Sequence, residues 1–181
     1  MSALMASRRK AADRKARRKA KRIRIAQDST GTAVAVPPRA TLSSVRNALQ
    51  RELNAAIRLR DGRLCISCGS LEGNQAGHLF AVGPFSGLRF HPLNEATQCA
   101  GCNKWRGGNH AAYAAAFIRR YGLATFEALD AIKGEPRQWR IGDLLTLRSA
   151  LRSGGLAEYQ CHYFALTGWV PLDNSGEVGG Q

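Results

Sequence analysis

Two pairs of cysteines have the spacing of metal ligands. Cys65 and Cys68 form one Cys-x-x-Cys pair, Cys99 and Cys102 form the other, and 30 residues separate them. Each pair suits a tight turn that offers two thiolates to one tetrahedral ion, so the two together predict an all-cysteine structural Zn²⁺ site. Cytosolic thiols stay reduced, which makes redox chemistry the weaker interpretation. The remaining cysteine, Cys161, is expected to be a small buried apolar side chain.

Polar and basic side chains lie between and just after these cysteines. Because metal binding contributes to folding, the zinc site would hold them in a defined geometry. His78 is a candidate general base, since neutral imidazole accepts protons near pH 7. Asn103 offers an amide oxygen to a hard catalytic ion such as Mg²⁺ or Mn²⁺. Arg89, Lys104 and Arg106 are candidate phosphate contacts, so the set suggests phosphodiester hydrolysis.

The chain is strongly basic. Its 181 residues include 27 Lys or Arg against 13 Asp or Glu, which gives a net charge of +14. A polyanion, most often nucleic acid, is the partner expected for such a protein. The sequence has neither an apolar run long enough to cross a membrane nor the apolar core of a signal peptide. We therefore predict a cytoplasmic protein without membrane contact.

The basic residues are concentrated near the N-terminus. Residues 8–24 hold eleven Lys or Arg and one acid, Asp13, with no apolar repeat that would anchor a helix to a core. We predict a mostly disordered basic arm that orders on a phosphate backbone, and a solvated tail without a partner is the open alternative. Gly31, Pro37 and Pro38 mark residues 27–40 as a linker, so arm and linker together span 1–40.

The folded part is predicted to begin near Thr41. A helix should follow and end at the Asp61-Gly62 turn, with one apolar face made by Val45, Leu49, Leu53 and Ile57. Helical patterns also cover 110–121, 125–132 and 141–152, whereas 63–98 suits small strands and loops. Core packing is expected for Tyr113, Phe117, Tyr121, Trp105 and Trp139. We assign the α+β class, with a domain over 41–155 and a C-terminal segment and tail over 156–181. The apolar part of that segment either packs on the core or supplies a contact.

The motifs around the cysteines resemble a known family. RLCISCG, QAGH, LRF, QCAGCN and GGN follow in an order and at distances similar to those of the NinG (Rap) recombination proteins of lambdoid phages. More broadly, the layout resembles that of HNH nucleases. The resemblance runs from about Val45 through Arg152. It implies a zinc-braced ββα-metal core flanked by helices, with the α beginning near Asn103. The implied activity is a structure-specific nuclease for branched DNA such as Holliday junctions and D-loops.

The resemblance also implies roles for single residues. The four cysteines match zinc ligands, His78 matches the general base, and Asn103 matches a ligand of the catalytic divalent ion. Asn94 matches the Asn that fixes the loop carrying the base. Gly77 stands where HNH nucleases usually have a metal-binding Asp, so either His78 binds the metal and another group is the base, or a further ligand completes the site. The candidates for that ligand are His91, Glu95 and Asn109. His91 is otherwise expected in a surface loop, and Asn109 as the N-cap of helix 110–121.

Two functional hypotheses remain at this stage. The first is the nuclease, for which branched double-stranded DNA is the implied substrate and phage or host recombination proteins are further implied partners. Cutting two strands of a symmetric junction would favour a homodimer. The second is a non-catalytic zinc-stabilised module that binds nucleic acid. Cysteines and charge serve both, whereas His78 with Asn94 and Asn103 favours the nuclease.

Overall fold

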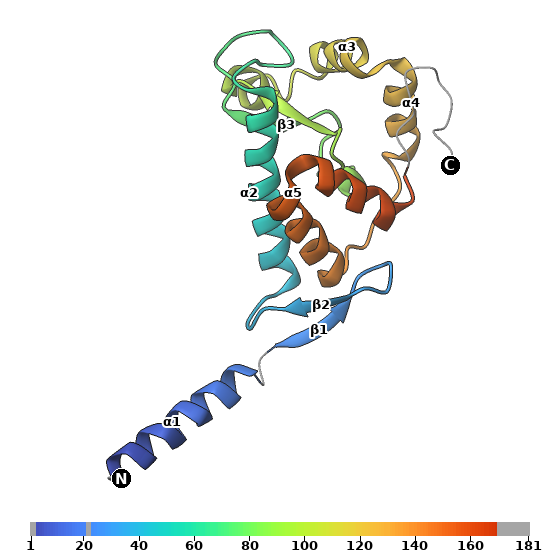
Figure 1. Cartoon of the computed structure of the whole chain (residues 1–181). Helices are drawn as coiled ribbons and strands as arrows, with labels where there is room; N and C mark the ends of the chain where they lie inside the picture. The colour runs from blue at the N-terminus through green and yellow to red at the C-terminus, as the bar shows by residue number, and fades with distance from the viewer. Residues whose placement is uncertain (1–2, 21–22, 170–181) are drawn as a thin grey trace.

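A helical body carries one projecting N-terminal helix (Figure 1). The computed structural model describes residues 3–20 and 23–169. The elements in chain order are α1 (Ala3–Ala20), β1 (Arg24–Gln27), β2 (Ala33–Val36), α2 (Leu42–Asp61), β3 (Gln75–His78), η1 (Ser86–Leu88), β4 (Glu95–Gln98), η2 (Gly101–Trp105), α3 (His110–Tyr121), α4 (Leu123–Ile132) and α5 (Ile141–Thr167). The predicted α+β class is confirmed. Across these described ranges, no helix has both the length and the apolar character that a membrane crossing requires.

Helix α2 forms where the sequence predicts it. Thr41 caps its first turn, because its hydroxyl accepts from the backbone N–H of Ser44 while the Ser44 hydroxyl accepts from the backbone N–H of Thr41. The helix ends at Asp61, and Gly62 continues with a φ of 63°, which glycine adopts without strain. Its buried face packs against α5 and consists of Val45, Ala48, Leu49, Leu53 and Ile57.

Helix α5 extends beyond the predicted helix at 141–152. It bends where Gly154 and Gly155 leave helical geometry, and then continues to Thr167. Tyr159, Tyr163 and Leu166 of the second half are buried in the same core as α2. The predicted boundary at residue 155 therefore does not separate two packing units, because the apolar stretch after it packs on the core. The C-terminal tail predicted from about Asp173 lies outside the described residues.

The prediction of a linker over 27–40 is wrong. Residues 24–36 form an antiparallel hairpin, β1–β2, that packs against α5. Gly31 supports its turn with a φ of 87°, and the two prolines follow the end of β2. The carboxylate of Asp28 is buried and accepts hydrogen bonds from Thr30, Thr32 and the hydroxyl of Thr146 in α5. The breakers therefore delimit a hairpin, and a side chain far along the chain holds it.

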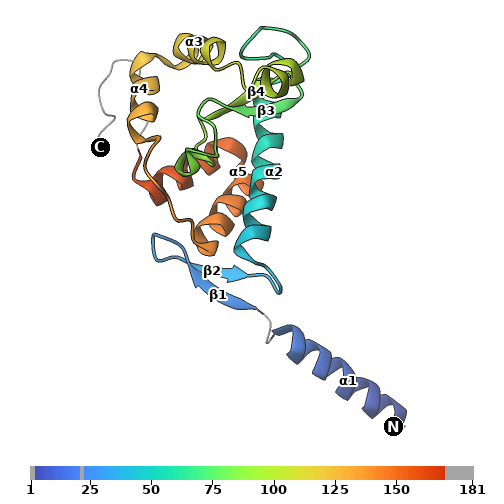
Figure 2. The same cartoon turned by 180° about the vertical axis from the view of Figure 1, so that it is seen from behind.

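The N-terminal arm also differs from the prediction. Residues 3–20 form the helix α1 rather than a disordered segment, and both views show it pointing away from the body (Figures 1 and 2). Alanine, lysine and arginine are all strong helix formers, which accounts for a helix without an apolar face. Arg8, Arg9, Arg14 and Lys15 are exposed on it. The helix thus presents positive charge to solvent.

A second antiparallel hairpin, β3–β4, lies at the C-terminal end of α2. Its register pairs Gln75 with Gln98 and His78 with Glu95. Arg60 of α2 donates to the carbonyl of Glu95, and Asp61 accepts from the backbone N–H of Thr97. A second apolar cluster lies between this hairpin, α3 and α4, and includes Leu79, Leu88, Ala96, Tyr113, Phe117 and Leu129. The hairpin is thereby fixed to α2 by polar contacts and to α3 by apolar packing.

Candidate metal centre and active site

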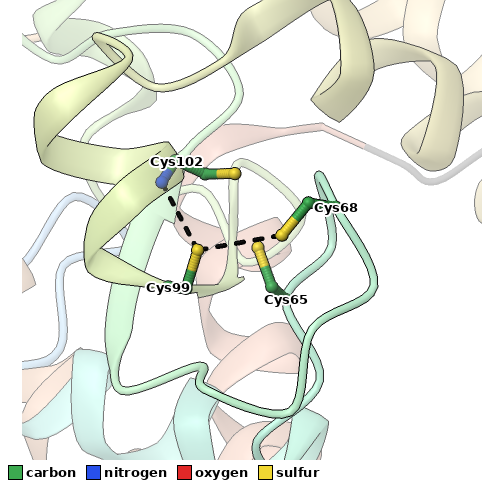
Figure 3. A group of neighbouring side chains, drawn as sticks. All are labelled: Cys65, Cys68, Cys99 and Cys102. Atoms are coloured by element: carbon green, nitrogen blue, oxygen red, sulfur yellow. Dashed lines mark hydrogen bonds between the residues drawn. The ribbon is translucent and has the colours of Figure 1, made fainter.

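The four predicted zinc ligands lie together. Figure 3 shows the four side chains converging, and their Sγ atoms all lie within 4.8 Å of one another. A tetrahedron of thiolates around zinc, with Zn–S bonds of about 2.3 Å, has sulfur–sulfur edges of about 3.8 Å. The Sγ atoms of Cys68 and Cys99 are 3.8 Å apart. The donor set and its size therefore fit a structural Zn²⁺ ion.

Backbone turns aim the thiols at this common point. In the first turn, Gly69 has a φ of 72° and its N–H donates to the carbonyl of Cys65. In the second, the backbone N–H of Cys102 donates to the Sγ of Cys99 at 3.4 Å (Figure 3). The amide of Asn109 donates to the Sγ of Cys102 at 3.4 Å. Such N–H donors stabilise thiolate charge, so the turns favour metal binding as well as shaping the site.

The thiols differ in acidity. Hydrogen bonding with Ser70 lowers the pKa of Cys68 to about 6. Burial raises the pKa of Cys102 to about 12, against the opposing effect of the Asn109 amide. A metal ion binds the thiolate form, so its binding must displace the proton from the buried Cys102. The exposed Cys68 offers the more accessible thiolate.

The amide of Gln98 links the two cysteine turns. This buried side chain donates to the hydroxyl of Ser67, between the first two cysteines, and to the carbonyl of Gly108, after the last two, both at 2.7 Å. Its Oε1 has no hydrogen-bond partner. A Cβ atom built on Gly77 would lie 1.8 Å from this oxygen, so the amide of Gln98 fills the space beside Gly77. An Asp at position 77 would need Gln98 to move.

His78 ends β3 and lies against a buried carboxylate. Its Nε2 is 2.9 Å from Oε1 of Glu95, which is fully buried, although the ring is not aligned as a hydrogen-bond donor. The amide of Gln50 in α2 donates to the same oxygen at 2.8 Å. The same amide donates to Oδ1 of Asn54, one turn further along α2, at 2.7 Å. The pair of His78 and Glu95 therefore sits on a polar support supplied by α2.

Asn94 holds the loop that follows His78. Its side chain is buried, accepts from the backbone N–H of Phe80 at 2.8 Å, and donates to the carbonyls of Phe80 and Leu88 at 3.1 Å each. The two ends of the loop are thus tied to one amide group. This geometry suits the loop-fixing role that the resemblance implies for Asn94.

Asn103 lies on the opposite side of the hairpin from His78. Successive side chains of a strand face opposite sides, so His78 shares its face with Glu95, whereas Gly77 shares its face with Gln98. The Oδ1 of Asn103 lies 3.0 Å from a Cβ built on Gly77, and its Nδ2 donates to Gln75. The expected meeting of His78 and Asn103 around one ion is not formed in this arrangement. Within the described ranges, the four cysteines are the only group of three or more Cys, His, Asp or Glu residues placed to hold a metal.

The predicted phosphate contacts fall in two places. Lys104 and Arg106 are exposed around η2, which forms one π-helical turn where the resemblance implies the start of a longer helix. Trp105 between them is 74% exposed and carries Lys104 over its ring, so the expectation that it packs is wrong. Arg89 is half-buried near Glu95, and burial together with Arg46 lowers its pKa. Positive charge thus flanks both the cysteine turns and His78.

Of the three proposed extra ligands, only Glu95 contacts His78. His91 is fully buried rather than in a surface loop, packs against Tyr163 and Trp169, and burial lowers its pKa to about 3. Asn109 precedes α3 but makes no side-chain cap, because its amide bonds Cys102 instead. A loop histidine next to a proline gave no indication of burial, which comes from the C-terminal half of α5 and the residues after it.

Sequence reasoning also misplaced Cys161 and missed three polar residues. Cys161 is exposed on α5 rather than buried. Gln50 and Asn54 were not proposed as site residues, although their spacing of four on a helix places them on one face. Gln98 directly precedes Cys99, but only the fold shows that its amide spans both cysteine turns.

Comparison with known proteins adds a family. The family model described as Bacteriophage Lambda NinG protein matches residues 2–155. The chain belongs to the NinG family. The match includes both cysteine turns, both hairpins and the first part of α5, so the arm and the β1–β2 hairpin are part of the family pattern. Membership suggests a role related to phage recombination. No curated protein and no solved structure matches the chain.

Proposed function

We propose that this NinG-family chain is an HNH-like, metal-dependent endonuclease that hydrolyses phosphodiesters in branched DNA. The contact between His78 and the buried Glu95 is the observation that carries the proposal. A buried carboxylate beside a partly exposed imidazole is a costly arrangement for a protein that only binds DNA, whereas in a nuclease the carboxylate orients the imidazole that acts as the general base. Family membership supports the same proposal, because it suggests a role related to phage recombination.

In this proposal, Glu95 orients His78. With the Nε2–H turned toward Oε1 of Glu95, the Nδ1 atom is left as the acceptor for a proton from the attacking water. The carboxylate then stabilises the imidazolium that forms. Asn94 keeps the loop after His78 in place, so that the ring meets the phosphate in a fixed orientation. Gln50 keeps the carboxylate of Glu95 from turning away.

A divalent ion, Mg²⁺ or Mn²⁺, would stabilise the charge that develops on the phosphate and the leaving oxygen. Glu95 is the residue among the candidate ligands that lies beside His78, so either Glu95 takes part in holding the ion or it acts on the ring alone. Asn103 contacts the face of Gly77 and would need the hairpin or the Gln98 amide to shift before sharing an ion with His78. Gly77 stands at the position where HNH nucleases have an Asp, and the amide of Gln98 fills the space that the Asp side chain would need.

The proposed substrate contacts are electrostatic. Arg89 next to the site and Lys104 and Arg106 on η2 would hold phosphates, and the exposed basic residues of α1 would extend that contact. Affinity from such contacts falls steeply with salt and carries no sequence preference. We propose branched double-stranded DNA as the partner, with a homodimer for cutting two strands of a junction.

The test is a cleavage assay on a labelled four-way junction and a matched linear duplex. Wild type, His78→Ala and Glu95→Gln are compared in Mg²⁺, in Mn²⁺ and in EDTA, after zinc content is measured for each. The matched control is His162→Ala, because His162 is exposed on α5. Cleavage of the junction that requires the divalent ion, is lost by about 10²-fold or more in His78→Ala and persists in His162→Ala would support the proposal.

The non-catalytic binding module is the alternative, and one observation favours it: Gln98 occupies the space of the usual metal-binding Asp. Tight binding of the junction by wild type and His78→Ala, with no cleavage in any metal, would reject the nuclease in favour of this module. Cleavage that survives in His78→Ala would keep a nuclease but remove His78 from its mechanism.

A further inference from the structure

An apolar hollow opens beside the loop that follows His78. Its walls come from residues 79–85 of that loop, from the first turns of α3 and from Phe126 of α4. It has a volume of about 380 Å³, which is within the usual range for small-ligand sites. Neither the cysteine site nor the contact of His78 with Glu95 uses it.

Three phenylalanines give this hollow an aromatic wall. The rings of Phe80 and Phe85 meet edge to face with centroids 6.0 Å apart, and Phe126 lies 5.7 Å from Phe80. Phe80 and Phe126 also pack against the buried cluster around Phe117, but Phe85 does not belong to that cluster. Phe85 therefore contributes its ring to the hollow without serving the core. The three side chains are half-buried, so part of each ring stays open to solvent, and such aromatic faces are the usual platforms on which nucleobases stack.

The ammonium group of Lys133 lies over two of these rings. The Nζ of Lys133 lies 5.4 Å from the centroid of Phe80 and 5.9 Å from that of Phe85, and it also pairs with Asp130. An apolar side chain of a protein partner fits this hollow less well, because it would bring no hydrogen-bond acceptor to the Lys133 ammonium. A nucleotide instead supplies a flat aromatic face for the rings and a phosphate for the ammonium.

The hollow is joined to His78 through the loop that follows β3. Asn94 bonds both the N–H and the carbonyl of Phe80, and Phe80 is two residues after His78. Tyr113 of α3 donates to the carbonyl of Gly77, which ties the strand before His78 to the same helix that lines the hollow. A ligand held by Phe80 therefore has a fixed position relative to the imidazole.

We propose that this hollow takes one unstacked nucleobase of a DNA substrate, packed against the wall that Phe80 and Phe85 form, with Lys133 at its phosphate. The inference rests on the proposed function, because it assumes a DNA ligand. Bases inside an intact duplex stay stacked and cannot reach the hollow, whereas branch points, bulges and gaps offer unstacked bases at low cost. The hollow would thus select DNA by an unpaired nucleotide near the cleavage site and not by sequence.

The test measures binding in EDTA, so that no strand is cut. The two probes are a fluorescent duplex with one unpaired adenine and the same duplex with an abasic residue at that position. Wild type is expected to bind the adenine probe about tenfold more tightly, since an unpaired adenine stacks on an aromatic side chain and an abasic residue has no base to stack. Phe85→Ala should bind both probes equally. Lys133→Gln should weaken both by a similar factor and keep the preference.

The matched control is Trp105→Ala, which removes an aromatic ring that is 74% exposed and lies outside the hollow. It should keep the preference for adenine, and the zinc content and melting temperature of each variant report on folding. Equal binding of the two probes by wild type, or a preference that survives in Phe85→Ala, would overturn the proposal. If only Trp105→Ala loses the preference, the base stacks on Trp105 of η2 and not in the hollow. An adenine preference without any junction cleavage would support base binding in the hollow and reject the nuclease. Junction cleavage without the adenine preference would support the nuclease and reject base binding in the hollow.

Discussion

Around α2 and α5 the core is built from leucines and tyrosines, whereas the segment from Gly62 to Asn109 closes on four cysteines. The first region buries Leu49, Leu53 and Tyr159 among many others, so its stability comes from apolar area removed from water. The second holds two four-residue strands and long irregular stretches around the clustered thiols. This segment also contributes Leu79, Leu88 and Ala96 to the second apolar cluster, but we expect metal binding to supply much of the order around the cysteine turns.

The two regions also differ in what they contribute. The α2–α5 region fixes Gln50 and Arg60, which reach across to Glu95, but it carries none of the proposed chemistry. The cysteine-held region contains His78, Asn94 and Glu95. The difference indicates that a rigid apolar scaffold supports a small polar site whose shape depends on an ion. The two regions should therefore respond separately to metal removal and to core mutation.

Zinc removal should have the largest effect. Cys99→Ser, or chelation of the wild type, removes a contribution of about 10–16 kcal/mol from the cysteine-held region. We expect amides of residues 62–109 to lose protection from hydrogen exchange, while the α2–α5 core stays protected. Hydrogen exchange followed by mass spectrometry checks this. Cys161→Ser is the control, because Cys161 is exposed and outside the cluster. Simultaneous loss of protection in both regions would show that they are not independent.

A cavity in the α2–α5 core should come next. Leu53 is fully buried, so Leu53→Ala is expected to lower the free energy of unfolding by about 2–5 kcal/mol. The folded variant should still bind one zinc ion per chain. Denaturant unfolding and metal analysis measure the two quantities. Leu59→Ala on the same helix is the control, since Leu59 is 86% exposed. Loss of zinc from folded Leu53→Ala would contradict the separation of the regions.

The third prediction asks whether the buried carboxylate of Asp28 stabilises the packing of the β1–β2 hairpin on α5. Asp28→Ala leaves the Thr30, Thr32 and Thr146 donors without their acceptor, so we expect a loss of about 1–3 kcal/mol. Faster exchange of the amides in the hairpin and at the start of α5 should accompany it. Asp13→Ala makes the same charge change on an exposed residue of α1 and should have little effect. Unchanged stability in Asp28→Ala would mean that the hairpin is held by apolar contacts alone.

The smallest predicted effect is on the stability of the α2–α5 core at low pH. Burial raises the pKa of Glu52, but hydrogen bonds from Arg148 and Arg152 outweigh it and bring the pKa to about 2. This group stabilises the fold above its ordinary pKa of 4.5, and that stability is lost as the pH falls from there toward 2. We expect about 1 kcal/mol, because Arg152 is largely exposed.

Unfolding of wild type and Glu52→Gln across this pH range measures the contribution, and Glu127→Gln, an exposed residue of α4, is the control. Zinc should leave at a higher pH than this window, since protons compete with the ion for the thiolates. As the pH falls, we therefore expect zinc to leave before the Glu52 contribution is lost. Zinc that stays bound after that contribution is lost would contradict this order.

Local pattern was enough for α2, α3 and the cysteine cluster. Apolar spacing placed α2 and α3 closely, because a buried stripe at helical period is visible in consecutive residues. The cysteine pairs specified their own cluster, because each turn is local and one ion needs four ligands. The breakers at 31, 37 and 38 were also real, but their meaning as hairpin limits depended on Asp28 reaching Thr146, 118 residues later.

The sequence by itself determined the basic charge, the helices α2 and α3 and the four cysteines that cluster, and it was sufficient for the family. Only the tertiary structure decided which polar residues meet. Glu95 lies beside His78 because the hairpin register pairs them, and Gln50 joins them from a helix 45 residues away. Asn103 faces the other side for the same reason, since alternate residues of a strand point in opposite directions. Register and packing across the chain set these contacts, and neither can be read from spacing alone.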